Sequence, residues 1–263
     1  MKIGFFDSGL GGILILKAVT ELLPQYDYEY YGDTKNLPYG DKPEEEIYQL
    51  TKDGVAALFA KDCLLVILAC NTASAQTLRR LQDEWLPTMY PDRRILGVII
   101  PMIEELSISN RTNALLVATK RTVESGKYEI ELQKKLVKKL KLTSVATPEL
   151  VPLIEAGKLE EASEQLLNLI LTTEQAVGEI DGVVLGCTHY GLLRPFLRQS
   201  IRRPSVTVFS QIEIIPKKLQ KYLVRHPEIN SRLTKQKQRN IYLTEHKPTY
   251  DQYLRDWLTG SSI

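Results

Sequence analysis

The sequence predicts an α/β fold of two similar halves, each built on a parallel β-sheet. Apolar runs of strand length alternate with amphipathic stretches of helix length, which is typical of parallel strands joined by crossover helices. Several of the apolar runs are continuous rather than alternating, as in strands that are covered on both faces. A strand that ends in cysteine and polar residues also occurs twice, so we expect the two halves to be related.

The expected elements follow these patterns. Strands are expected at residues 3–6, 28–31, 64–69, 95–99, 114–118, 142–145, 183–185 and 207–209. Helices are expected at residues 44–61, 74–84, 126–140 and 159–177. The first of these helices begins after Pro43 with three glutamates, which interact favourably with the positive end of a helix dipole.

The repeated strand ends indicate an internal duplication. One strand ends in the motif ACNT at Cys70 and another in the motif GCTH at Cys187, which lies 117 positions further on. The first strand ends at Asp7 and a later one runs into Thr119, which gives a similar offset of 112 positions. Because sites in such folds lie at the carboxyl ends of the strands, we expect these side chains to line a cleft between the two halves.

The composition is that of an ordinary globular protein. The chain has 263 residues, of which 43% are hydrophobic and 25% are charged, and its net charge is +2, so nothing in it points to nucleic acid or a membrane. No apolar run approaches the roughly 18 residues that span a bilayer. The first residues predict a strand rather than a secretory signal, and the three cysteines favour reduced thiols, so we expect a cytoplasmic protein.

The stretch from residue 216 to residue 247 is basic, with nine Lys or Arg against two Glu. We interpret it as a solvated helix and loop, with strand signals only at residues 240–244. A docking surface for an acidic partner is the alternative.

Cys70 and Cys187 are the leading candidates for catalysis. Each follows an apolar strand and precedes an expected helix, and the positive end of a helix lowers the pKa of a thiol. With an ordinary pKa near 8.5, only about 3% of a thiol is thiolate at pH 7, so a lowered pKa would matter. The alternative for each cysteine is a buried structural role. Cys63, which begins a strand, is interpreted as structural.

Other polar residues at strand ends are candidates for contacts with a substrate. His189 lies two positions after Cys187, where it could transfer a proton or polarise a carboxylate. The glycine-rich run from Asp7 to Gly12 lets the backbone approach a ligand, but its glycines do not match the dinucleotide-binding pattern. The loop around Tyr39 and Gly40 offers backbone N–H groups to a carboxylate.

Two other kinds of chemistry fit the sequence poorly. A metal site is not expected, because the pair Cys187 and His189 lacks further close ligands and no C-x-x-C motif is present. A cysteine hydrolase needs one nucleophile and a base, which leaves the second cysteine unexplained.

These motifs resemble those of the glutamate racemases, within the aspartate/glutamate racemase superfamily. The resemblance runs in order from residue 1 to about residue 200, and the two cysteine motifs together are highly specific. The matching segments are residues 7–12, 32–34, 38–40, 69–74, 119 with 122, 151–155 and 186–190.

The resemblance implies two similar flavodoxin-like domains with parallel sheets and an active site in the cleft between them. One domain would comprise residues 1–96 with 208–263, and the other residues 97–207. The implied activity is cofactor-independent interconversion of L- and D-glutamate, which supplies D-glutamate for peptidoglycan in the cytoplasm. The family is commonly dimeric, so a homodimer is expected.

The resemblance also implies the roles of individual residues. Cys70 and Cys187 would be the acid/base thiols, assisted by Asp7, Glu155 and His189. The implied substrate-binding residues are Asp7, Ser8, Pro38, Tyr39, Gly40, Asn71, Thr72, Thr119, Thr122, Thr188 and His189.

Two thiols suit racemisation because the α-proton must leave one face of the carbon and return on the other. One group acts as thiolate and the other as thiol, and they exchange roles with direction. No pyridoxal cofactor is required, and Lys120 is the only lysine of the motif loops that could form a Schiff base. The alternatives are a racemase for aspartate or another acidic amino acid, and a non-catalytic protein that binds a partner in the same cleft.

Two positions and one segment depart from the family pattern. Ile100 stands where the family usually has an acidic residue, and Thr147 where a cysteine is often found. The segment Phe209-Ser210-Gln211 replaces a segment like Asp-Ser-Gly. We expect these departures to affect the packing of the C-terminal segment, the dimer contact or regulation more than the reaction.

Overall fold

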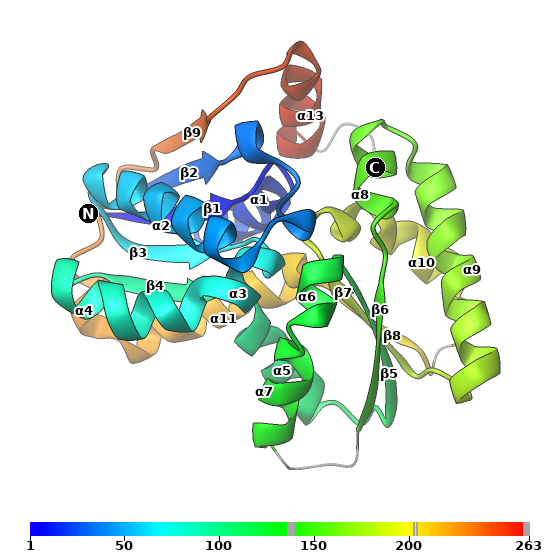
Figure 1. Cartoon of the computed structure of the whole chain (residues 1–263). Coiled ribbons are helices and arrows are strands. Elements are labelled where there is room, and N and C mark those ends of the chain that lie inside the picture. The colour runs from blue at the N-terminus through cyan, green and yellow to red at the C-terminus, as the bar shows by residue number, and fades with distance from the viewer. Residues whose placement is uncertain (136–139, 202, 204, 260–263) are drawn as a thin grey trace.

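The computed structural model describes residues 1–135, 140–201, 203 and 205–259, and it contains two parallel sheets (Figure 1). The first sheet has five strands in the order β4-β3-β1-β2-β9, and the second has four in the order β6-β5-β7-β8. The predicted α/β class with parallel sheets is therefore confirmed. The strands are β1 (Lys2–Asp7), β2 (Tyr28–Gly32), β3 (Cys63–Leu68), β4 (Arg94–Gly97), β5 (Asn113–Ala118), β6 (Lys141–Ala146), β7 (Gly182–Gly186), β8 (Thr207–Phe209) and β9 (Arg239–Leu243).

The two sheets repeat one topology. When β1 to β4 are matched with β5 to β8, both sheets have the order second, first, third, fourth, which is the flavodoxin-like order. The first sheet adds β9 beside β2. Cys70 follows β3 and Cys187 follows β7, so the cysteines occupy equivalent places in the two halves. The division into residues 1–96 with 208–263 and 97–207 stays a prediction; its second boundary falls inside β8.

The first sheet is covered on both faces. Helix α1 (Gly12–Leu22) and helix α11 (Gln211–Arg225) pack on the face that carries Ile3 and Phe5. Helix α2 (Glu44–Ala60) and helix α3 (Asn71–Arg80) pack on the opposite face, around Phe6. Neighbouring residues of β1 therefore point into different apolar layers, as the alternation of side chains along a strand requires.

The second sheet is built in the same way (Figure 1). Helices α5 (Ile99–Ile108) and α7 (Lys127–Lys135) cover the face with Leu116, whereas α9 (Leu159–Val177) and α10 (Arg194–Ser200) cover the face with Leu115. The remaining helices are α4 (Leu86–Met89), α6 (Lys120–Glu124), α8 (Leu150–Glu155), α12 (Pro227–Asn230) and α13 (Pro248–Thr259), with 3₁₀ turns at Thr34–Asn36, Tyr39–Asp41 and Thr188–Leu193 and a π-helical turn at Leu81–Trp85.

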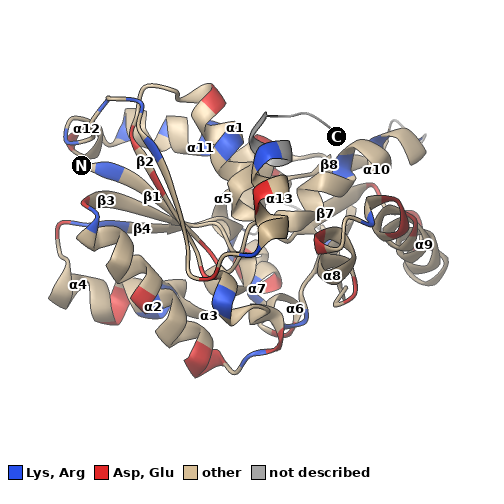
Figure 2. Ribbon diagram, turned by 90° about the horizontal axis from the view of Figure 1, so that it is seen from above, with Lys and Arg blue, Asp and Glu red and all other residues tan. Residues whose placement is uncertain are grey.

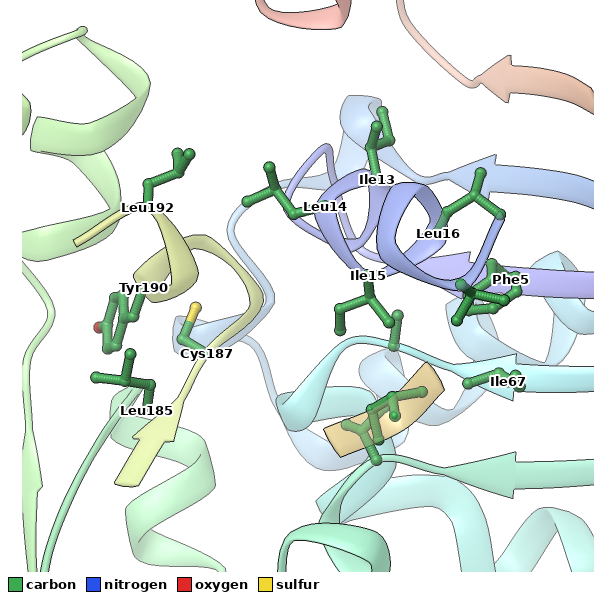
Figure 3. Close-up of a cluster of buried hydrophobic side chains, with 14 of the residues drawn as sticks. Phe5, Ile13, Leu14, Ile15, Leu16, Ile67, Leu185, Cys187, Tyr190 and Leu192 are labelled. Atoms are coloured by element: carbon green, nitrogen blue, oxygen red, sulfur yellow. The ribbon is translucent and has the colours of Figure 1, made fainter. Parts of the chain in front are cut away.

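One of the apolar clusters extends through both halves. Leu14 and Ile15 of α1 belong to the same buried cluster as Tyr190 and Leu192, which lie in the 3₁₀ turn after β7 (Figure 3). Because one continuous cluster crosses the junction, burial of apolar surface stabilises the position of the two sheets relative to each other.

The expected strand at 95–99 is partly wrong, since β4 ends at Gly97 and α5 begins at Ile99. The apolar residues there belong to a helix that buries Ile99, Met102 and Ile103, and an apolar run by itself does not distinguish a strand from a buried helix. The helix expected at 74–84 begins earlier, at Asn71, and passes into a π-helical turn after Arg80.

Two other helices that the sequence predicts are present in the structure. The helix at 159–177 is confirmed with the predicted bounds. Of the helix expected at 126–140, the structure describes α7 up to Lys135, and residues 136–139 lie outside the described residues.

The interpretation of residues 216–247 as a solvated helix and loop is wrong in part. Helix α11 buries Ile215, Pro216, Leu219 and Leu223 against the core of the first half. Strand β9 pairs with β2, close to where strand signals were found. The lysines and arginines occupy the outward positions, which made the segment look solvated. Lys, Arg, Asp and Glu are intermixed over the outer helices (Figure 2).

Among the described residues, no helix is both long enough and apolar enough to cross a membrane.

Close packing of α2 on β1 gives a test of the fold. A methyl group on Gly54 of α2 would overlap the ring of Phe6, although alanine is the better helix former. We expect Gly54→Ala to lower the free energy of unfolding by about 1–3 kcal/mol, as overpacking does, measured by urea denaturation. Asp53→Ala, on the exposed side of the same helix, is the control and should change it by no more than about 0.5 kcal/mol. A stabilised Gly54→Ala protein would contradict this packing.

Candidate active site

A cavity of about 260 Å³ lies at the carboxyl ends of the strands, between the two halves. In each sheet the strand order reverses between the first and third strands, and the crevice outside such a point is the usual ligand site of this fold. Twelve of the predicted site residues line the cavity: Ser8, Pro38, Tyr39, Gly40, Cys70, Asn71, Thr72, Thr119, Glu155, Cys187, Thr188 and His189.

Two predicted residues are near the cavity but do not line it. Asp7 is fully buried behind Ser8, and its Oδ1 accepts a hydrogen bond from the backbone N–H of Gly9 at 2.8 Å. Thr122 lies behind Thr119, with 2.9 Å between their hydroxyl oxygens. Neither side chain reaches the cavity, so Asp7 and Thr122 can affect a ligand only through neighbouring residues such as Ser8 and Thr119.

Cys70 caps the N-terminus of α3. Its Sγ accepts a hydrogen bond from the backbone N–H of Ala73 at 3.4 Å and lies 3.3 Å from the hydroxyl of Ser8. Burial nevertheless raises the pKa of this thiol to about 12, and the nearby Asp7 carboxylate adds to the rise. The expected lowering of its pKa is thus wrong, because the cost of placing a charge in a buried site exceeds the stabilisation by the helix terminus.

Cys187 lies in a different setting. A 3₁₀ turn follows it rather than an α-helix, and its side chain makes no capping hydrogen bond. Its Sγ lies 3.9 Å from Nδ1 of His189. The neighbour of this sulfur is therefore an imidazole, whereas the neighbours of Cys70 are a hydroxyl and a backbone N–H group.

His189 is held between Cys187 and Glu155, whose Oε1 is 3.1 Å from Nε2 of the imidazole. Burial lowers the pKa of His189, but its contacts with Cys187 and Glu155 outweigh burial and raise it to about 10. Burial raises the pKa of Glu155, and His189 reverses this effect, so that the pKa of Glu155 is lowered. The imidazole is therefore a cation at neutral pH.

The glycine-rich loop after β1 packs directly on the loop after β7. A methyl group on Gly11 would overlap the side-chain oxygen of Thr188 and would lie 2.7 Å from Nδ1 of His189. Burial raises the pKa of Asp7 in this loop, and the positive charge of His189 opposes that rise. Asp7 of the first half and His189 of the second half therefore interact electrostatically.

Hydroxyl groups join the halves on the other side of the cavity. Thr72 of α3 lies 2.8 Å from Thr119, the residue that caps α6, measured between the hydroxyl oxygens. The hydroxyl of Tyr39 donates to Asp33 at 2.7 Å, which holds the loop that carries Gly40. These threonine hydroxyls and backbone groups can hydrogen-bond the carboxylates of a small acidic ligand.

Sequence reasoning missed several cavity residues: Leu37, Asp41, Lys120, Thr147, Pro148, Val151 and Pro152. Lys120 and Thr147 had been noted for other reasons, and Val151 and Pro152 belong to the matching segment 151–155, but no contact with a substrate was predicted for any of them. Thr147 also contacts Tyr190, with 2.7 Å between their hydroxyl oxygens, and Tyr190 donates to the Thr147 carbonyl at 3.0 Å. Closeness to the strand ends was the available signal for these residues.

The departures at 209–211 and at Ile100 lie in different places. Gln211, the first residue of α11, reaches Asn71 at the start of α3. Ile100 lines a second and larger cavity of about 580 Å³, which α3, α5 and α11 surround and which neither Cys70 nor Cys187 lines. Both thiols and the imidazole of His189 line the smaller cavity.

Within the described part of the chain, no group of three or more His, Cys, Asp or Glu side chains is arranged to hold a metal ion.

Comparison with known proteins places these features in a family. Glutamate racemases of Dinoroseobacter shibae and Ruegeria pomeroyi are 36% and 37% identical to this chain over 240 residues, which is 87% of this chain and 86% and 87% of theirs. The crystal structure of glutamate racemase isoform RacE1 from Bacillus anthracis superposes with a TM-score of 0.85 at 27% identity, covering 98% of this chain and 94% of that one. Residues 15–216 match the family described as Asp/Glu/Hydantoin racemase. The chain belongs to this racemase family.

Proposed function

We propose that this protein is a glutamate racemase that interconverts L- and D-glutamate with two cysteines and without a cofactor. One observation carries the proposal: Cys70 and Cys187, from equivalent strand ends of two repeated halves, line one cavity. The names of relatives that align with 87% of the chain support glutamate as the substrate.

In the proposed reaction, one thiolate removes the α-proton and the opposite thiol delivers its own proton to the other face. By resemblance to the family, Cys187 deprotonates L-glutamate and Cys70 deprotonates the D form. Burial keeps Cys70 as a thiol, which suits its proposed role as proton donor in the direction from L to D, and His189 lies beside Cys187, the proposed base. After turnover the protonation states are exchanged, and the reverse direction is ready.

The remaining residues would bind the substrate and stabilise the carbanion. Pro38, Tyr39 and Gly40, with Thr119, would hold one end of the amino acid, and Thr122 would act through Thr119. Ser8, Asn71, Thr72, Thr188 and His189 would hold the other. Asp7 and Glu155 would act indirectly, by fixing the charge of His189. Proton transfer contributes about 10²–10⁴-fold in rate, so fixed hydrogen-bond donors at the carboxylates must supply much of the rest.

We also propose that the protein acts as a homodimer in the cytoplasm and supplies D-glutamate for peptidoglycan. These assignments rest on the family.

The two-thiol mechanism predicts the behaviour of cysteine variants. Cys70→Ala and Cys187→Ala should each lower racemisation by at least about 10²-fold, followed by circular dichroism with L-glutamate. Cys63→Ala is the matched control, because Cys63 is also buried but begins β3 far from the cavity, and it should stay within a few-fold of the parent. In D₂O the D product should gain deuterium at the α-carbon from the first turnovers, while the L pool stays protonated. Near-parent racemisation by either catalytic variant would refute the mechanism.

The ion pair of His189 with Glu155 predicts a pH effect. The pKa of His189 is raised from 6.5 to about 10 and that of Glu155 is lowered from 4.5, so the pair stabilises the fold fully between pH 4.5 and pH 6.5. This contribution disappears as the pH rises through 10 or falls through the lowered pKa of Glu155. Glu155→Gln removes one cause of the rise, so the imidazole should titrate at lower pH. Nitrogen-15 NMR of labelled histidine measures the midpoint, with His189→Asn identifying the signal. An unchanged midpoint would show that Glu155 does not control this charge.

The substrate assignment predicts discrimination against aspartate. Aspartate is one methylene shorter, so residues that hold both carboxylates of glutamate would contact one of them poorly. A missing methylene group lowers kcat/KM by about 10–200-fold. We therefore expect kcat/KM for aspartate to be at least about 10-fold below kcat/KM for glutamate. Equal values of kcat/KM for the two amino acids would contradict the assignment of glutamate.

A further inference from the structure

A buried polar cluster lies beside the cavity and joins three segments of the chain. It consists of Asn71 at the start of α3, Tyr128 in α7 and Gln211 at the start of α11. The three side chains are 3%, 0% and 3% exposed. Asn71 belongs to the first half and Tyr128 to the second, and Gln211 lies where the chain returns from the second half to the first.

The cluster is closely hydrogen-bonded. Asn71 Nδ2 donates to Gln211 Oε1 at 2.9 Å, and Gln211 Nε2 donates to Asn71 Oδ1 at 2.7 Å, so the two amides form a reciprocal pair. The hydroxyl of Tyr128 also donates to Asn71 Oδ1, at 2.8 Å. Burial raises the pKa of Tyr128, and a side-chain hydrogen bond with Gln211 partly opposes this rise. Tyr128 and Gln211 are therefore also in contact with each other.

These bonds determine what Asn71 can offer a ligand. A side-chain amide has two N–H donors and one oxygen with two lone pairs. Here the oxygen accepts from both Gln211 and Tyr128, and one N–H is used by Gln211. Since Asn71 also lines the cavity, the group left for a ligand is the second N–H. Rotation of the Asn71 amide, which would present its oxygen instead, would break both bonds to Gln211 and the bond that Tyr128 now donates.

We propose that Gln211 and Tyr128 are positioning residues, which hold the Asn71 amide as a hydrogen-bond donor to a carboxylate oxygen of the substrate. The proposal rests on the glutamate racemase function proposed above and names the group that Asn71 recognises. It excludes the substrate ammonium as the partner of Asn71, because an ammonium group can only donate. It also assigns a role to Gln211, where this chain departs from the family pattern.

Gln211→Met removes both bonds to Asn71 at similar side-chain volume and tests the proposal. Freed to rotate, Asn71 should bind the substrate less well, so KM for glutamate should rise about tenfold, as expected for one lost charge-assisted hydrogen bond, while kcat changes less. Tyr128→Phe keeps the ring and the amide pair, so it should fold and raise KM by a smaller factor. It carries the test if Gln211→Met does not fold.

A double-mutant cycle separates positioning from general stability. In an Asn71→Ala background there is no amide to position, so adding Gln211→Met should leave KM unchanged. A further rise in KM in that background would show that Gln211 acts by another route. A KM equal to that of the parent in the folded Gln211→Met and Tyr128→Phe proteins would overturn the proposal while the racemase function stands. A parent protein that does not racemise glutamate would overturn both.

A separate variant tests whether Asn71 donates to a substrate carboxylate or accepts from the substrate ammonium group. Asn71→Asp replaces the donor with a negative acceptor, so it should repel a carboxylate and raise KM more than Asn71→Ala does. If Asn71→Asp bound glutamate better than Asn71→Ala, the partner would be the ammonium group and the donor assignment would be wrong.

Discussion

The contact between the loop after β1 and the loop after β7 is the constraint on which the site depends. Gly11 has no side chain, so its backbone can lie against Thr188 and His189 of the opposite half. The apolar cluster behind this contact continues through both halves, so the sheets are fixed with their carboxyl edges facing each other. Repetition of one topology then brings the strand ends that carry Cys70 and Cys187, one from each half, to the same cavity.

Burial gives these symmetric positions unequal electrostatics. Cys70 has a helix terminus and a hydroxyl as neighbours, and desolvation still dominates its pKa. Cys187 has an imidazole as its neighbour, and Glu155 helps to keep that imidazole charged. A reaction that needs one thiolate and one thiol at the same time benefits from this difference, because two identical environments would favour the same protonation state in both.

The hydrogen bonds of Asn71 link the residue after Cys70 to the segment where the chain crosses between the halves. Gln211 stands at the return crossover and Tyr128 in the second half, yet both bond to the residue that follows Cys70. Removing one member of a buried cluster leaves other polar groups unsatisfied, which makes the cluster specific in geometry. Asn71, which lines the cavity, is thus held by a residue of the second half and by a residue at the crossover between the halves.

The sequence alone determined the fold class, most strand positions, the internal repeat and the residues at the strand ends, because these follow from hydrophobic periodicity and local motifs. Twelve predicted site residues line the cavity for that reason. Tertiary structure decided the rest. The start of α5 was indistinguishable from a strand until its burial was known, and α11 looked solvated because its apolar positions face a core built by distant residues. The pKa of Cys70, the charge of His189 and the partner of Gln211 depend on groups that are remote in sequence, since desolvation and hydrogen bonding act between neighbours in space.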